Sequence, residues 1–194
     1  MTDRRFLRTE RQLVAAMLHL AREKPYHAIT VDDIAAQADI ARKTFYAHFA
    51  NKQQLLWHSL QTEFEAIIAE SSDLNPQSLL MDGKPLSYPV FQHIYDYAVL
   101  YRDILNDNAD AVFMLQLWDY ITAQSFMKHA ALRAIAPFLT VPPELIAHVM
   151  SGALLGAVRW WLQSDMQTSP EQMAYRFSQL LAPGVLQSMG LDGD

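Results

Sequence analysis

Apolar residues recur at helical spacing along almost the whole chain, whereas the alternating pattern of a half-buried strand is nearly absent. In residues 13–21, for example, leucine, methionine and alanine side chains fall three or four positions apart and so share one face of a helix. A 51% apolar content also supplies enough side chains for a sizeable core. We therefore predict an all-α globular protein of about nine helices.

Capping residues and prolines set the limits of the first helices. The first helix is predicted over residues 9–23, because Thr9 and Gln12 have capping-box spacing and Lys24-Pro25 ends the helix. The next three helices are predicted at 31–38, at 41–47 and from about 51 to 70.

A segment rich in proline, glycine and serine at residues 71–87 is predicted to be a loop, and it marks a change in the pattern. Beyond it, one or two helices are predicted over residues 88–105, and single helices over 110–135, 143–164 and the segment from 170 onward. We expect two domains, a helix-turn-helix domain at 1–52 and a helical effector-binding and dimerisation domain at 53–194.

Charge is distributed unevenly along the chain. The net charge is −6, but residues 1–52 carry +3 and residues 53–194 carry −9. A basic head on an acidic body is able to bind phosphate through one face only. The chain has no cysteine, and its longest uncharged apolar stretch, 145–158, is too short to span a bilayer. We expect a cytoplasmic protein.

The segment from Thr30 to Lys52 has the pattern of a helix-turn-helix. Thr30 and Asp33 are spaced to cap the first helix, and Asp39 falls in the turn, where a left-handed backbone is often needed. Phe45 and Phe49 are predicted to point into the core. The outward residues of the second helix can then reach base edges and phosphates in a major groove.

This segment closely resembles the DNA-binding domain of the TetR family of regulators. The matching residues are Thr30, Ile34-Ala35, Ala38, Thr44-Phe45-Tyr46, His48-Phe49 and Lys52 with Leu55. The resemblance implies binding to double-stranded DNA, with contacts from Thr30, Arg42, Lys43, Thr44, Tyr46, His48 and Lys52. Two positions depart from the family pattern, since Asp39 replaces the usual turn glycine and Ala41 the usual serine cap. Losing such a cap typically costs about 1 kcal/mol.

The C-terminal part is predicted to dimerise and to bind a small molecule. Its last two helices are apolar on most sides, so either a two-fold four-helix bundle or burial within one chain would cover them. Dimerisation is assigned to Val149, Ala153, Ala157, Trp160, Trp161, Phe177 and Leu181. A pocket for a small apolar or aromatic effector is assigned to Tyr88, Phe91, Tyr95, Phe113, Leu117 and Trp118. An aromatic stripe at this spacing is equally consistent with plain core.

The sequence contains no glycine-rich phosphate loop, nucleophile elbow or zinc-protease motif. We therefore expect no enzyme activity, cofactor or metal site. The leading hypothesis is a ligand-responsive repressor that binds a palindromic operator as a homodimer. The alternative is a protein of the same fold that acts as a co-activator or binds a partner without an operator of its own.

Overall fold

The computed structural model describes residues 4–70, 85, 87–107, 110–133 and 141–188. Over these residues the chain forms nine α-helices and no strand, as predicted. The N-terminal helices are α1 (Arg4–Glu23), α2 (Val31–Gln37), α3 (Arg42–His48) and α4 (Lys52–Glu70). The C-terminal helices are α6 (Tyr88–Asp96), α7 (Ala98–Arg102), α8 (Ala111–Arg133), α9 (Pro143–Gln163) and α10 (Pro170–Ser188).

One helix prediction needs correction. The first helix begins at Arg4 rather than at Thr9, which lies inside α1 and does not cap it. The segment at 88–105, predicted as one or two helices, forms α6 and α7 and continues into a π-helical turn, Asp103–Asp107. Most of the loop predicted at 71–87 lies outside the described residues.

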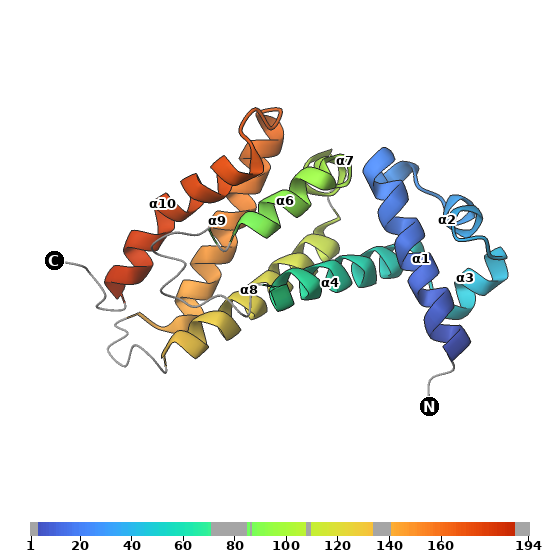
Figure 1. The fold of residues 1–194 in the computed structure, drawn as a ribbon, viewed down its shortest axis with the longest axis horizontal. Helices are drawn as coiled ribbons and strands as arrows, with labels where there is room; N and C mark the ends of the chain where they lie inside the picture. The colour runs from blue at the N-terminus through green and yellow to red at the C-terminus, as the bar shows by residue number, and fades with distance from the viewer. Residues whose placement is uncertain (1–3, 71–84, 86, 108–109, 134–140, 189–194) are drawn as a thin grey trace.

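The helices form two regions, which α4 connects (Figure 1). Helices α1, α2 and α3 lie together at one end, and α9 and α10 lie at the other. Helix α8 packs on α9, α6 packs on α10, and α1 packs on α4 and α7 as well as on α2. We call the α1–α3 region the head and the part beyond α4 the body.

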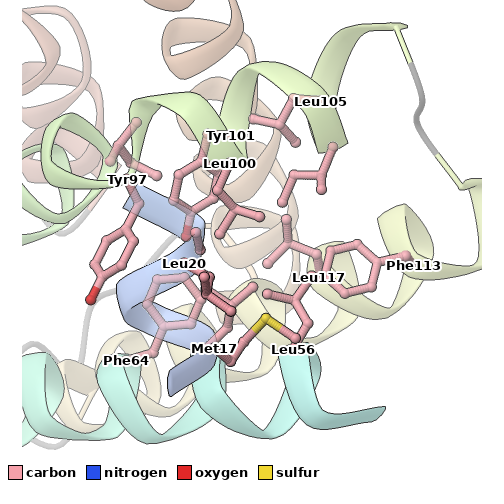
Figure 2. Close-up of a cluster of buried hydrophobic side chains, with 14 of the residues drawn as sticks. Met17, Leu20, Leu56, Phe64, Tyr97, Leu100, Tyr101, Leu105, Phe113 and Leu117 are labelled. Carbon is pink, nitrogen blue, oxygen red and sulfur yellow. The ribbon is translucent and has the colours of Figure 1, made fainter. Parts of the chain in front are cut away.

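One continuous hydrophobic core runs through the head and the body. Figure 2 shows Met17 and Leu20 of α1 beside Leu56 of α4, close to Leu100 and Tyr101 of α7. All five side chains are buried. Helix α1 therefore contributes to the packing of both regions.

Helix α9 has 21 residues and is long and apolar enough to cross a membrane by length and composition alone. The uncharged apolar stretch at 145–158 has 14 residues, but the whole helix is longer, so helix length does not exclude a membrane span. About one third of its most apolar window is buried within the chain, and one side of the helix packs on α8.

His93 is a polar side chain inside the core. Only 5% of it is exposed, and its Nε2 atom lies 3.0 Å from the hydroxyl of Tyr101, with which it shares a hydrogen bond. Burial, with a smaller contribution from the positive charge of Arg22, lowers the pKa of His93 from 6.5 to about 4. The Glu63 carboxylate lies 3.7 Å from the other ring nitrogen and does not reverse this direction.

Stability is expected to fall between pH 6.5 and pH 4 because of His93. In this range the unfolded chain protonates the imidazole and the folded chain does not, so acid favours unfolding. The expected loss from this group is about 3 kcal/mol, from 1.36 kcal/mol for each pKa unit. Denaturant unfolding at the two pH values should show a smaller loss for His93→Gln than for wild type. The exposed His19 provides the control, and His19→Gln should leave the wild-type pH dependence in place. Equal losses in wild type and His93→Gln would contradict the assignment.

Candidate DNA-binding site

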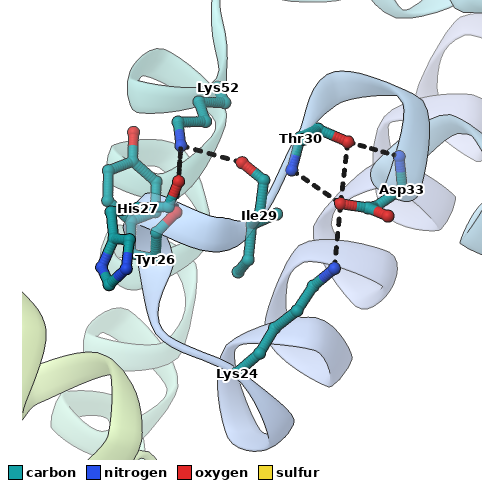
Figure 3. A network of polar contacts seen from close by, with 7 residues as sticks. All are labelled: Lys24, Tyr26, His27, Ile29, Thr30, Asp33 and Lys52. Atoms are coloured by element: carbon teal, nitrogen blue, oxygen red, sulfur yellow. Dashed lines mark hydrogen bonds and ion pairs between the residues drawn. The ribbon is translucent and has the colours of Figure 1, made fainter.

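Helix α2 begins at a complete capping box. The Thr30 hydroxyl accepts a hydrogen bond from the Asp33 amide at 3.1 Å, and the Thr30 amide donates to the Asp33 carboxylate at 2.8 Å. The same hydroxyl donates to Asp33 at 2.7 Å, and Lys24 lies 2.9 Å from that carboxylate (Figure 3). Lys24 first, and then Thr30, lower the pKa of Asp33. The predicted cap is confirmed, and the Thr30 hydroxyl is occupied by it.

The turn between α2 and α3 has the predicted geometry. Asp39 has φ of 53°, which is the left-handed region that glycine occupies more readily. Ala41 precedes α3 and makes no side-chain cap hydrogen bond. Phe45 is fully buried and anchors α3 against the core. The short α3 is therefore held by packing rather than by a cap.

Helix α3 turns Arg42, Lys43 and Tyr46 to solvent, while Thr44 is half-buried. The Arg42 guanidinium lies 2.7 and 2.8 Å from the two carboxylate oxygens of Asp32 on α2. It also donates to the Tyr46 hydroxyl at 3.3 Å, and it lies 5.7 Å from the centre of the Tyr46 ring. Two predicted DNA contacts thus touch each other, and one of them, Arg42, is also paired with an acidic residue to which the sequence analysis gave no role. The ten-residue separation of Asp32 and Arg42 gave no local pattern by which to find the pair.

Lys52, a predicted phosphate contact, is engaged within the protein. Its Nζ atom donates to the backbone carbonyls of Ile29 at 2.8 Å, Tyr26 at 3.0 Å and His27 at 3.3 Å (Figure 3). The ammonium group also lies 4.4 Å from the centre of the Tyr26 ring. Burial lowers the pKa of Lys52, although nearby Asp103 opposes the shift. In this structure Lys52 therefore joins the start of α4 to the segment before α2 through hydrogen bonds.

His48 ends α3 and stacks on Phe6 of α1. The two ring centroids are 4.0 Å apart and the rings are inclined by 26°. The Nδ1 atom of His48 is buried and has no hydrogen-bond partner among the described residues. The stack therefore holds the first turn of α1 against the end of α3.

A polar contact also joins the head to the body. Asp103, in the π-helical turn, accepts a hydrogen bond from the backbone amide of His27 at 2.8 Å. Its other carboxylate oxygen lies 2.7 Å from Nδ1 of His27. Asp103 is 7% exposed, so this carboxylate is nearly removed from solvent. The pair is 76 residues apart in the chain, which explains why no sequence pattern indicated it.

The residues predicted for the effector pocket are divided between two parts of the body. Phe91 packs edge-on against Trp161 and Phe177, whereas Phe113 packs edge-on against Trp57 of α4. The remaining members also differ in burial: Leu117 is buried, Tyr88 and Trp118 are half-buried, and Tyr95 is exposed and stacks on Trp161.

Helix α8 carries polar groups in the body that the sequence analysis did not select. The Tyr120 hydroxyl is buried and has no hydrogen-bond partner among the described residues. The Tyr120 ring packs between Trp57 and Phe64 of α4, with centroids 5.7 and 5.9 Å away. The Thr122 hydroxyl is likewise buried without a described partner. Buried polar groups normally form hydrogen bonds, so these two hydroxyls make this part of α8 unusual.

The predicted dimerisation residues are also divided. Trp161 and Phe177 are buried within the single chain, because they pack against Phe91. Val149 and Trp160 are exposed, at 55% and 54%. The other three members, Ala153, Ala157 and Leu181, are half-buried.

The head and its surroundings define the class of protein. A capped helix, a left-handed turn and a short exposed helix, supported by α1 and followed by a helical body, form a helix-turn-helix regulator. Residues 13–57 match the family described as bacterial regulatory proteins of the tetR family, and residues 84–183 match its transcriptional regulator C-terminal region. The chain therefore belongs to the TetR family of DNA-binding transcriptional regulators.

Individual relatives agree with this assignment. The chain is 29% identical over 188 residues to YxbF of Bacillus subtilis (strain 168), an uncharacterized HTH-type transcriptional regulator. The match covers 92% of this chain but 46% of YxbF, so the chain spans about half the length of that relative.

Two solved structures show the same fold. The fatty acid degradation regulator FadR from Bacillus halodurans superposes with a TM-score of 0.67 at 18% identity, covering 91% of this chain and 96% of FadR. RolR, solved with its ligand resorcinol, superposes with a TM-score of 0.66 at 14% identity, covering 96% of this chain and 94% of RolR.

Proposed function

We propose that this chain is a ligand-responsive repressor that binds a palindromic DNA operator as a homodimer in the cytoplasm, without catalytic activity. The observation that carries the proposal is the geometry of α3. Its buried Phe45 fixes the helix, and Arg42, Lys43 and Tyr46 stand on the opposite, exposed side. A short helix presented in this way fits a major groove, where Lys43 can donate to bases or phosphates.

A two-fold dimer is supported by an exposed apolar stripe on α9. Leu145, Val149 and Trp160 are exposed and lie at helical spacing along one side of the helix, together with the exposed Gly156. A Cβ atom added to Gly156 would have no neighbour within 4 Å, so a second helix could approach closely there. Helix α10 adds the exposed Tyr175 and Leu180. Large apolar side chains in such a stripe are typical of an interface.

An apolar or aromatic effector is supported by the surroundings of Tyr120. Its hydroxyl, which has no hydrogen-bond partner in the described part of the chain, could bind a polar group of the effector, while Trp57 and Phe64 would contact the apolar part. RolR, of the same fold, is known with resorcinol, which is an aromatic ligand with hydroxyl groups. An effector at Tyr120 would displace α4, which carries Lys52 and so is joined to the segment before α2. The spacing of the two heads would change, and the dimer would fit its operator less well.

The test is a fluorescence-anisotropy titration against DNA from around the protein's own gene and against a random-sequence duplex of equal length. Lys43→Ala is expected to weaken binding to the specific fragment by about tenfold, because a good base or phosphate contact is worth about 1–3 kcal/mol. The matched control is Arg102→Ala, an exposed arginine on α7 in the body, which should leave binding unchanged. A folded wild-type protein that binds neither DNA would instead favour the partner-binding alternative.

The pairing of Asp32 with Arg42 leads to a further prediction. Asp32→Asn removes a carboxylate from the exposed face of the head and releases the guanidinium for DNA. Affinity for a random-sequence duplex should rise about fivefold, since an exposed charge contact is worth up to about 1 kcal/mol. Asp119→Asn makes the same charge change on α8, at another exposed aspartate, and should have no such effect. Weaker binding by Asp32→Asn would mean that Asp32 positions Arg42 for DNA instead of competing with it.

A further inference from the structure

The first turns of α1 carry a cluster of arginines that the predicted DNA-binding set does not include. Because α1 begins at Arg4, the residues Arg4, Arg5, Arg8 and Arg11 all belong to the helix, and all four are exposed. The acidic residue of this stretch, Glu10, lies 2.9 Å from His58 of α4 and is turned to that helix. Within the described part of the chain, Arg4, Arg8 and Arg11 form no ion pair.

The spacing of these three arginines places them on one face of α1. Positions 4, 8 and 11 are separated by four and three residues, so the side chains lie one above the other. This face is opposite the buried face that contains Leu13, Met17 and Leu20. Side chains on a helix lean toward its N-terminus, so the guanidinium groups extend toward the beginning of α1.

The beginning of α1 lies next to the recognition helix. Phe6, on the same turns as the arginines, stacks on His48 at the end of α3 with 4.0 Å between the ring centroids. Figure 1 shows the N-terminal turns of α1 beside α3, at the end of the molecule opposite to α9 and α10. Phe6 is on the opposite side of α1 from the three arginines, so the arginines do not face α3; they lie at the same end of the molecule as α3 and are remote from α9 and α10.

We infer that Arg4, Arg8 and Arg11 form a second DNA contact, which binds backbone phosphates beside the major groove that α3 occupies. The inference rests on the proposed function. Arginine is suited to this role, because its planar guanidinium binds phosphate oxygens in pairs. Such contacts carry no sequence information but fix the position of the head on the duplex. They also supply positive charge that Lys52 and Arg42 do not offer freely, since those two side chains are engaged within the head.

The salt dependence of DNA binding tests this contact directly. The probe is a random-sequence duplex of about 30 base pairs, titrated by anisotropy over a range of salt concentrations. Each phosphate contact contributes about −0.9 to the slope of log K against log salt. The triple variant Arg4→Gln, Arg8→Gln, Arg11→Gln should therefore show a slope shallower by about 2 to 3 than that of wild type. Glutamine keeps helix propensity, and a thermal melt of the variant should match that of wild type.

A matched pair of single variants provides the control. Arg8→Gln should make the slope shallower by about 0.9, whereas Arg102→Gln, at another exposed helical arginine, should not change it. Equal slopes for wild type and the folded triple variant would overturn the inference while leaving the proposed function intact. A loss of affinity for the specific fragment only would also overturn it, because phosphate contacts affect all sequences alike. Wild-type protein without salt-dependent binding would refute the proposed function itself.

Discussion

Replacing Lys52 with methionine is expected to lower the free energy of unfolding by about 2 to 3 kcal/mol, because hydrogen bonds from a charged donor are worth about 1.5–3 kcal/mol. The substitution keeps an apolar stem but leaves the carbonyls of Tyr26, His27 and Ile29 without their shared donor. The segment before α2 would loosen, and the recognition helix would lose its fixed orientation. DNA affinity should therefore fall as a consequence of lost structure.

Lys43→Met is the matched control, since Lys43 is an exposed lysine on α3. It should change the free energy of unfolding by less than about 0.5 kcal/mol, as surface substitutions usually do, while weakening DNA binding. Urea denaturation of the two variants separates the roles of the two lysines. If Lys52→Met kept wild-type stability and only reduced DNA affinity, Lys52 would be the phosphate ligand that the sequence predicted.

The adjacent tryptophans of α9 should affect different properties when each is replaced by alanine: Trp161 the stability of the single chain, and Trp160 the dimer. Trp161 is 0% exposed, donates its indole N–H to the Thr168 carbonyl at 2.8 Å and packs against Phe91. Trp161→Ala should therefore lower the free energy of unfolding by about 3–5 kcal/mol, as expected when a buried aromatic side chain is replaced by alanine. Trp160 is 54% exposed, and its removal should leave the fold of the single chain intact.

Trp160→Ala should instead weaken the proposed dimer. A tryptophan at the centre of an interface typically contributes about 2 kcal/mol or more, which corresponds to a dissociation constant raised about 30-fold. Sedimentation velocity over a range of concentrations measures this constant, and chemical unfolding measures the effect of Trp161→Ala. A dimer unaffected by Trp160→Ala would place the interface elsewhere than on the α9 stripe.

Features encoded by neighbouring residues were predictable from the sequence. The Thr30–Asp33 capping box, the left-handed Asp39 and the buried Phe45 each depend on residues within a few positions of one another. The sequence therefore predicted the helix-turn-helix and its limits within one residue or so. The start of α1 was missed, because Thr9 offered a local cap whereas the Phe6–His48 stack that orders the preceding turns joins distant segments.

Roles that depend on tertiary contacts were not predictable in this way. The position of Lys52 fits both a phosphate ligand and a clamp on the head, and only the placement of three carbonyls distinguishes them. Likewise, Trp160 and Trp161 are chemically identical neighbours, but their side chains point about 100° apart around the helix. Burial of one and exposure of the other follow from how α9 rests on the rest of the body.

The shared core described for α1 has a consequence for how the molecule unfolds. The boundary predicted at residue 52 separates Met17 and Leu20 from their neighbours Leu56 and Leu100, all of which belong to one buried cluster. Cutting the chain there would expose apolar surface on both fragments, so we do not expect the head to be stable on its own. We therefore expect a single cooperative transition in which both regions melt together. Exchanging heads between relatives would succeed only if the facing residues of α1 and α4 were transferred as a set.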